Sequence, residues 1–549
     1  MFTMYNAFLE VISFLKFLFS TPDFIFIFPV LGILISPFAY VFFNKEEVKF
    51  FFLGFSIVIL LQNTYQAYQL MIANNSGVNF VNFRYLEACY SIGNNIDFYA
   101  VIDNISALHI IITAFVITVC FINITFNTPK RIDALTFLLF IIQFLLYVGF
   151  SCPNFFVFYT CFEASLIPFF LIVGIWGGRE EFRIASAFRL IFYTLVCSTP
   201  LFISLIYVFS IDKSFDFTHI KFFTSQTVLF QNIFIISALL SFFVKVPVIP
   251  FHSWLPDAHS EAPTLGSILL AGVMLKLGTY GLYRLMWPLT KLDSSILDLK
   301  TFIISIAIFT ICMSCYLLSR EIDIKRIVAL YSINHMGFVV LGLCMNQYGV
   351  TGSMVINASH CLSSVGLFFL VGQLYSRLHS RKLSDMKGLA FSVPLFSFFL
   401  VLLFLANMSF PSTLNFTGEF SVVTSVSNLF LFSEITSNSI TISFFNLFFT
   451  YFWYFIFLFS IIWAGIISVR FLTILLFSTP DFFSLRTGSI NTSYKISDST
   501  LLEDATFYEI VVLTILVLTL LCSAFMFADI STFFDPKLSY STRFISIFN

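Results

Sequence analysis

The chain has 549 residues, of which 59% are apolar and 10% are charged, whereas soluble domains carry about 25% charged residues. Its formal net charge of −1 argues against a nucleic-acid partner. Stretches of about 20 apolar residues recur from end to end, so the sequence predicts an all-α polytopic membrane protein.

Fourteen transmembrane helices are predicted from the apolar runs. They cover residues 24–43, 50–72, 100–124, 134–152, 154–176, 185–209, 232–251, 263–287, 300–318, 324–345, 352–376, 393–432, 444–475 and 508–530. The segment 7–20 would add an interfacial helix. The twelfth span is too long for one straight crossing and contains Pro411 and Gly418, so two half-helices are expected there.

The basic residues of the loops predict the orientation of the chain. With the N-terminus outside, sixteen of the 28 Lys and Arg residues fall on the inner side and eight on the outer side. Four basic residues remain inside spans, namely Arg189, Lys245, Lys276 and Arg284. The two arginines are expected to snorkel to an interface, whereas the two lysines lie too deep for that.

Glu163 lies inside the fifth span and Lys245 inside the seventh, two residues before Pro247. Charged side chains in lipid are costly and are usually paired or functional. The two are therefore expected to form an ion pair whose opening releases a proton. A static structural salt bridge is the alternative. Because proline breaks a helix and frees backbone carbonyls, the seventh span is predicted to be discontinuous, like the twelfth.

His252 and His259 follow this break, in a predicted loop. Two histidines could bind a metal, but a gating or packing role is favoured. The only close cysteine pair, Cys312 and Cys315, lies in an apolar helix and cannot complete a four-ligand site by itself. These cysteines are interpreted as small core residues, and no cofactor site is predicted in the chain.

The eighth span carries Lys276 among small residues, the tenth carries His335 and the eleventh carries His360. Glu419 follows the break in the twelfth span. Histidine titrates near physiological pH and passes protons through both ring nitrogens. Acids, lysines and histidines in successive spans are typical of a proton relay rather than of a substrate pocket. The alternative is that these histidines are structural, as a single buried histidine usually is.

The matched breaks in spans seven and twelve predict an internal repeat. Five spans separate the breaks, so two successive five-helix units would enter the membrane from opposite sides. The inverted repeats would cover residues 134–287 and 300–475. They lie within a core of residues 100–475, preceded by N-terminal helices and a polar loop (1–99) and followed by a loop and one last span (476–549).

Several of these stretches resemble the antiporter-like subunits of respiratory complex I. The resemblance is carried by Phe162–Pro168, Val244–Pro247, His252–Pro263, Leu275–Gly278 and Asp323–Gly337. The stretch HSWLPDAHSEAP is the most specific of them. The resemblance runs from about residue 100 to residue 475, and the two ends of the chain match poorly.

The resemblance implies a proton-translocating subunit of NADH:ubiquinone oxidoreductase. It maps the coupling pair to Glu163 and Lys245, and the exit residue to Glu419. It implies central residues at Lys276, His335 and His360. FMN, the iron–sulfur clusters and ubiquinone would belong to other subunits of the complex.

The expected partners are neighbouring membrane subunits and lipids, and the expected location is the mitochondrial inner membrane. The protein would be organelle-encoded, since its 79 phenylalanines fit an AT-rich genome. Its N-terminus would face the intermembrane space. Two alternatives stay open, a subunit of a multi-subunit cation/proton antiporter and a scaffold that has lost pumping.

Overall fold

A computed structural model describes most of the predicted spans. The described residues are 24–75, 90–91, 97–98, 100–127, 129–212, 228–289, 297–436, 444–478 and 503–525. The predicted interfacial helix 7–20 and nearly all of the loop 478–504 lie outside them. Within the described ranges, twelve helices are long and apolar enough to cross a membrane, and two shorter apolar helices accompany them.

Every predicted span corresponds to helix. The first half of the chain forms α2 (Phe24–Phe42), α3 (Lys45–Asn75), α4 (Asn104–Phe126), α5 (Ile132–Ser151), α6 (Phe155–Ala164), α7 (Leu166–Trp176), α8 (Glu180–Asp212), α10 (Val228–Lys245), α11 (Trp254–Glu261), α12 (Thr264–Leu269), the π-helix η2 (Leu270–Met274) and α13 (Leu275–Leu289).

The second half forms α14 (Leu297–Leu318), α15 (Ile324–Leu343), α16 (Gln347–Leu378), the 3₁₀-helix η4 (Leu383–Met386), α17 (Leu389–Ser392), α18 (Pro394–Asn407), α19 (Leu414–Thr436), α20 (Phe444–Phe477) and α21 (Phe507–Phe525). Two short strands, β1 (Tyr90–Ser91) and β2 (Asp97–Phe98), pair antiparallel within the predicted polar stretch before α4.

Both predicted helix breaks are confirmed. α10 ends at Lys245, and the chain turns before α11 begins at Trp254. α18 ends at Asn407, and α19 begins at Leu414. The fifth span, predicted as one helix, is also interrupted, at Ser165 between α6 and α7. Pro168 explains this third break, because its ring has no N–H to donate and clashes with the carbonyl four residues earlier.

The prediction that His259 lies in a loop is wrong, because α11 contains it. The indole N–H of Trp254 donates to the carbonyl of Val244 at 2.9 Å and so ties the start of α11 to the end of α10. Pro256 lies in the first turn of α11, where a missing N–H costs nothing. The helix ends before Pro263.

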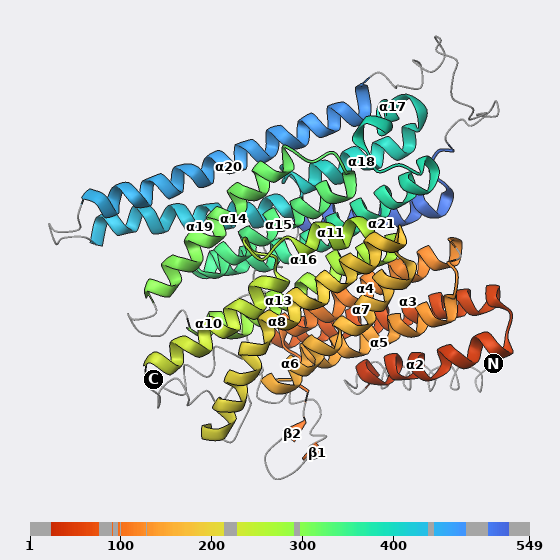
Figure 1. The fold of residues 1–549 in the computed structure, drawn as a ribbon, viewed down its shortest axis with the longest axis horizontal. Helices are drawn as coiled ribbons and strands as arrows, with labels where there is room; N and C mark the ends of the chain where they lie inside the picture. Colours follow the sequence, from red (N-terminus) through yellow and green to blue (C-terminus); the bar gives the residue numbers. More distant parts are fainter. Residues whose placement is uncertain are drawn as a thin grey trace.

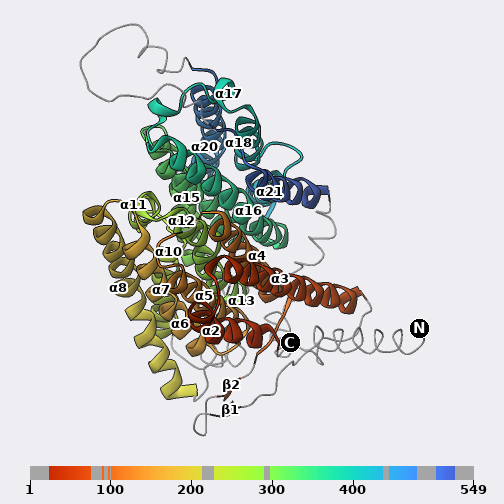
Figure 2. The same cartoon turned by 90° about the vertical axis from the view of Figure 1, so that its right-hand side faces the viewer.

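The helices run side by side, with α2 to α8 on one flank and α14 to α20 on the other (Figures 1 and 2). The segment from α12 to α13 lies between them and contacts α4, α10, α15 and α16. Residues 265–285 are all buried, whereas only 28% of the most apolar stretch of the peripheral α20 span is buried. The interior of the molecule is therefore built around this segment, α15 and α16.

Candidate functional site

Lys276 lies at the centre of this interior, in the first turn of α13. Its side chain is fully buried. The π-helix η2 widens the helix immediately before it, and the ammonium donates to the Ala271 carbonyl of that turn at 2.9 Å. Such π-turns inside helices are frequent at functional sites. The same ammonium lies 2.8 Å from Nδ1 of His360 on α16.

The two predicted histidines lie next to each other. The ring centroids of His335 and His360 are 5.6 Å apart. Nδ1 of His335 lies 3.0 Å from Oε1 of Glu419, and its Nε2 lies 3.3 Å from Oδ1 of Asn407. We call the four residues Lys276, His360, His335 and Glu419 the central row. The structure thus brings together four of the six predicted site residues.

The break between α18 and α19 positions one end of the central row. Asn407 is the last residue of α18, and Glu419 lies in the second turn of α19. The Asn415 amide donates to the Ala406 carbonyl at 2.7 Å, across the break. The same carbonyl also accepts from the Ser409 N–H at 3.2 Å, so the Asn415 amide adds a second donor at the end of α18 and ties α19 to it. The irregular backbone therefore brings two polar side chains to the same histidine.

Lys245 and Glu163 lie close together, but the predicted ion pair between them is not formed. The buried ammonium of Lys245 donates to the carbonyl of Phe162 and lies 3.1 Å from the centroid of the Phe162 ring. Neither carboxylate oxygen of Glu163 has a hydrogen-bond partner among the described residues. The residue immediately before the acid thus binds the lysine, through its carbonyl and its π-face.

Gly278 brings Lys245 close to the helix that carries Lys276. A Cβ atom at Gly278 would lie 3.1 Å from Cβ of Lys245 and 2.7 Å from a methyl group of Val246. A larger residue at position 278 would therefore push α13 away from the break after α10. A small residue near Lys276 thus allows a close approach of helices at this position.

His259 is a buried histidine that sequence reasoning assigned to gating or packing. Its ring stacks on Phe368 of α16, with centroids 4.5 Å apart and planes inclined by 6°. Neither ring nitrogen has a hydrogen-bond partner within the part of the chain that the structure describes. Nearby, the buried Lys325 ammonium donates to the Ala262 carbonyl at the end of α11, at 2.9 Å. The His259 ring is therefore packed against Phe368, but its two nitrogens make no hydrogen bond within the described residues.

Sequence reasoning missed a buried ion pair. Arg284, expected to snorkel, is only 9% exposed and donates to both carboxylate oxygens of Asp103, at 2.6 and 2.7 Å. It also donates to the Tyr280 hydroxyl at 2.9 Å. Arg284 cannot reach an interface because Asp103, the N-cap of α4, holds it inside. The signal for this ion pair in the sequence was Asp103, an acidic residue directly before the apolar helix α4.

Another histidine, His109, lies beside this ion pair, with its ring centroid 5.3 Å from that of Tyr280. It is fully buried, with Nδ1 2.7 Å from the Ile105 carbonyl and Nε2 3.1 Å from the Asn357 amide. The Thr279 hydroxyl donates to the Asn357 carbonyl oxygen at 3.2 Å. Both nitrogens of His109 are therefore satisfied, which fits a structural histidine beside the central row.

The family comparison covers most of this interior. Residues 152–445 match the family model described as "NADH:quinone oxidoreductase/Mrp antiporter, TM". This range includes the central row, Lys245, Glu163 and all three helix breaks. Asp103 and His109 lie before it.

Related sequences come from bacteria and eukaryotes. The chain is 36% identical to NADH-quinone oxidoreductase subunit M of Rickettsia typhi over 327 residues, 59% of this chain and 65% of the relative. It is 38% identical to NADH-ubiquinone oxidoreductase chain 4 of Acanthamoeba castellanii over 328 residues, 58% of this chain and 64% of the relative. These two alignments span slightly less than two thirds of the relatives' length. A third, to subunit M of Rickettsia prowazekii, has 33% identity and spans 66% of this chain and 73% of the relative.

Two solved structures share the fold. A chain of respiratory complex I from Thermus thermophilus with bound NADH superposes with a TM-score of 0.74 at 19% identity, over 96% of this chain and all of that one. A chain of the archaeal membrane-bound sulfane sulfur reductase gives a TM-score of 0.74 at 14% identity, over 95% and 99%. With its family match, its relatives and its polytopic fold, the chain belongs to the NADH:quinone oxidoreductase/Mrp antiporter transmembrane family.

Proposed function

We propose that this chain is a proton-translocating membrane subunit of an NADH:quinone oxidoreductase, equivalent to subunit M or chain 4 of its relatives. The observation that carries the proposal is the central row. A lysine, two histidines and a glutamate from four different helices lie in one row through the buried interior. Lys276 and His360 are 2.8 Å apart and His335 and Glu419 are 3.0 Å apart, while the two histidine ring centroids are 5.6 Å apart.

The donors and acceptors of the row define how a proton would move. An ammonium only donates, so Nδ1 of His360 accepts from Lys276 and the neutral ring carries its proton on Nε2. Transfer to Nδ1 makes the ring cationic, and loss of the Nε2 proton then passes the charge toward His335. On His335, Nε2 lies 3.3 Å from the Asn407 Oδ1 and would donate to it. Nδ1 makes no hydrogen bond within the described residues and lies 3.0 Å from the Glu419 carboxylate, so it would accept the proton and pass it to that carboxylate.

Glu163 and Lys245 would couple this movement to the neighbouring half of the complex. The Glu163 carboxylate makes no hydrogen bond in the described structure, so it is free to exchange between partners. Its approach to Lys245 would compete with the Phe162 carbonyl for the ammonium. The energy would come from quinone reduction in other subunits, which would carry FMN, the iron–sulfur clusters and ubiquinone.

We place the protein in the mitochondrial inner membrane, as a multi-pass, organelle-encoded subunit with its N-terminus in the intermembrane space. The excess of basic residues in the loops on one side supports this orientation. Its partners would be the adjacent antiporter-like subunits of the complex.

The proposal is tested by Lys276→Arg in the assembled complex reconstituted into vesicles. Arginine keeps the positive charge but does not release a proton at neutral pH. We expect proton translocation and coupled quinone reduction to be lost, while Lys300→Arg at the start of α14 leaves both unchanged. Normal translocation with arginine at position 276 would refute a relay through this residue.

A subunit of a multi-subunit cation/proton antiporter is the second candidate, because the matched family covers both kinds of protein. The names of the relatives favour the oxidoreductase. Isolation of the native complex separates the two candidates, since only an oxidoreductase would bring flavin-containing and iron–sulfur subunits with this chain.

A further inference from the structure

The loop that follows α10, residues 246–253, is hydrogen-bonded to a helix from the second half of the chain. The backbone N–H of Ile249 donates to the hydroxyl oxygen of Thr310 on α14, at 3.3 Å. Ile249 is 7% exposed and Thr310 is fully buried. Since Ile249 lies in the first predicted repeat and Thr310 in the second, this bond joins the two halves close to Lys245.

The loop has few other ways to satisfy its backbone. Its two prolines have no N–H to donate. The N–H groups of Val246 and Val248 donate to carbonyls of α10 at 2.8 and 2.9 Å, and the N–H of Phe251 donates to the Val248 carbonyl at 2.7 Å. Within 246–251, only the Ile249 N–H therefore relies on another helix. At membrane depth no bulk water can replace Thr310, so an unpaired N–H would be costly.

The Thr310 hydroxyl is oriented to accept this bond. It donates its own proton to the carbonyl of Ile306, one turn earlier in α14, at 2.8 Å. A hydroxyl has one proton and two lone pairs, so a lone pair is left for the Ile249 N–H. The bond within α14 holds the side chain in one rotamer. The same oxygen thus bonds to its own helix and to the loop of the other half.

The bond to Thr310 fixes the chain only four residues after Lys245. Val244, Val246 and Val248 are fully buried, so this stretch is packed on all sides. The Lys245 ammonium donates to the Phe162 carbonyl of α6. The position of the loop against α14 therefore decides where the end of α10, and the lysine that it carries, lies relative to α6.

We propose that Thr310 is a positioning residue for proton translocation. It would hold the loop after α10 so that the Lys245 ammonium stays within reach of both the Phe162 carbonyl and the Glu163 carboxylate. Thr310 would carry no proton itself, but would keep the end of α10 in place while the lysine exchanges partners. This inference rests on the proposed function of the chain.

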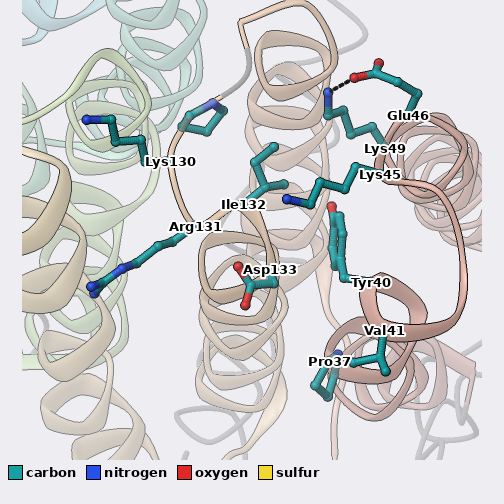
Figure 3. A pocket seen from close by; sticks show the side chains of 11 residues that line it. Pro37, Tyr40, Val41, Lys45, Glu46, Lys49, Lys130, Arg131, Ile132 and Asp133 are labelled. Atoms are coloured by element: carbon teal, nitrogen blue, oxygen red, sulfur yellow. Dashed lines mark hydrogen bonds and ion pairs between the residues drawn. The ribbon is translucent and has the colours of Figure 1, made fainter.

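The polar pocket at the ends of α2, α3 and α5 provides a control site outside both repeats. The residues that line it lie within 37–49 and 129–133. Lys49 is paired with Glu46 at 2.6 Å, and Lys45 faces Asp133 (Figure 3). Because these charges are satisfied within the N-terminal part of the chain, Lys45→Gln should not alter translocation.

The test compares Thr310→Val with Thr310→Ser in the whole complex reconstituted into vesicles. Valine has the shape of threonine but accepts no hydrogen bond, whereas serine keeps the hydroxyl. We expect valine to slow translocation per assembled complex about tenfold, equivalent to about 1.4 kcal/mol for a buried donor left unpaired, and serine to retain the rate. Ser314→Ala removes a buried hydroxyl of α14 that donates to the Ile311 carbonyl, and should leave the rate unchanged. An unchanged rate with valine would overturn the proposal.

A double variant separates positioning from a loss of stability. Glu163→Asp keeps the charge and is expected to retain partial translocation. If Thr310 acts through Lys245 and Glu163, adding Thr310→Val to Glu163→Asp should slow translocation by clearly less than tenfold, because residues that act as a unit are not additive. A smaller folded population would instead multiply the two defects, and that result would contradict a positioning role.

The unaltered complex provides the test if the valine variant does not assemble. A density map should place Oγ1 of Thr310 within hydrogen-bond distance of the Ile249 nitrogen, and a longer separation would overturn the proposal. Lys276→Arg distinguishes this inference from the proposed function. Normal translocation in Lys276→Arg would refute the relay, whereas its loss together with an unaffected Thr310→Val would refute only the role of Thr310.

Discussion

Nδ1 of His335 lies 3.0 Å from Oε1 of Glu419, which α19 carries just beyond the break that separates it from α18. In the proposed relay, Glu419 is the terminal acceptor of the central row. Glu419→Gln keeps the shape of the side chain but removes the titratable group. We expect proton translocation to fall at least about a hundredfold, the low end of what a positioned acid or base contributes.

The same pair can be tested for serial action. If protons pass through both residues, His335→Ala combined with Glu419→Gln should be no slower than the slower single variant, since groups that act as a unit are not additive. Fluorescence of a pH-sensitive dye in vesicles measures the rates. Multiplying defects would instead show that His335 and Glu419 act on separate paths.

Glu163→Gln should show whether Glu163 acts in proton translocation or in the stability of the complex. Because no described hydrogen bond depends on the Glu163 carboxylate, the substitution is expected to leave the thermal unfolding midpoint of the complex unchanged and to abolish translocation. Glu163→Asp, which keeps the charge, should retain partial activity. A lowered midpoint with intact pumping would make Glu163 a structural residue.

His259→Phe distinguishes a packing role of His259 from a gating role. His259 lies in α11, the helix that follows the break after Lys245. Phenylalanine preserves the stack on Phe368 and removes two buried nitrogens without described partners, so the midpoint of unfolding should rise slightly. We expect translocation to slow at the same time, because the ring could no longer carry a proton. An unchanged rate would confine His259 to packing.

Arg284→Met tests the buried ion pair. The substitution leaves the Asp103 carboxylate without its counter-charge and should destabilise the protein by about 3–5 kcal/mol. Adding Asp103→Asn should restore much of this loss, since asparagine still caps α4 and carries no charge. A double variant as unstable as Arg284→Met alone would mean that lost arginine packing, not the buried charge, causes the defect.

The same pair predicts a pH dependence. Burial raises the pKa of Asp103, but the charge of Arg284 and hydrogen bonds from Arg284 and Ser106 outweigh it and hold the pKa below its usual 3.8. A lowered pKa contributes stability above the usual value, and this stability is lost as the pH falls through the lowered value. The unaltered protein should therefore lose this contribution only below about pH 4. In Arg284→Met the raising effect of burial is no longer outweighed, so the variant should gain stability as the pH falls toward 4, and the difference between the two proteins should shrink already above that pH.

The sequence by itself determined the transmembrane spans and the candidate site residues. A bilayer admits only long apolar helices, so the fourteen predicted spans could be located from apolar runs alone. Proline at positions 247 and 411 predicted two helix breaks, because its effect is local to the backbone. The cost of charge in lipid singled out Lys276, His335, His360 and Glu419 before any contact was known.

Only the tertiary structure decided which of these residues meet. Whether Lys245 would bind Glu163 depended on the competing carbonyl and ring of Phe162, which packing of α10 against α6 places closer to the ammonium. Asp103 and Arg284 are far apart in the chain, and no local pattern links them. Periodicity and composition indicate whether each residue prefers water, lipid or the protein interior. A contact between two side chains depends on how each helix is rotated and how deep it lies in the membrane, and these are set by the packing of all neighbouring helices together.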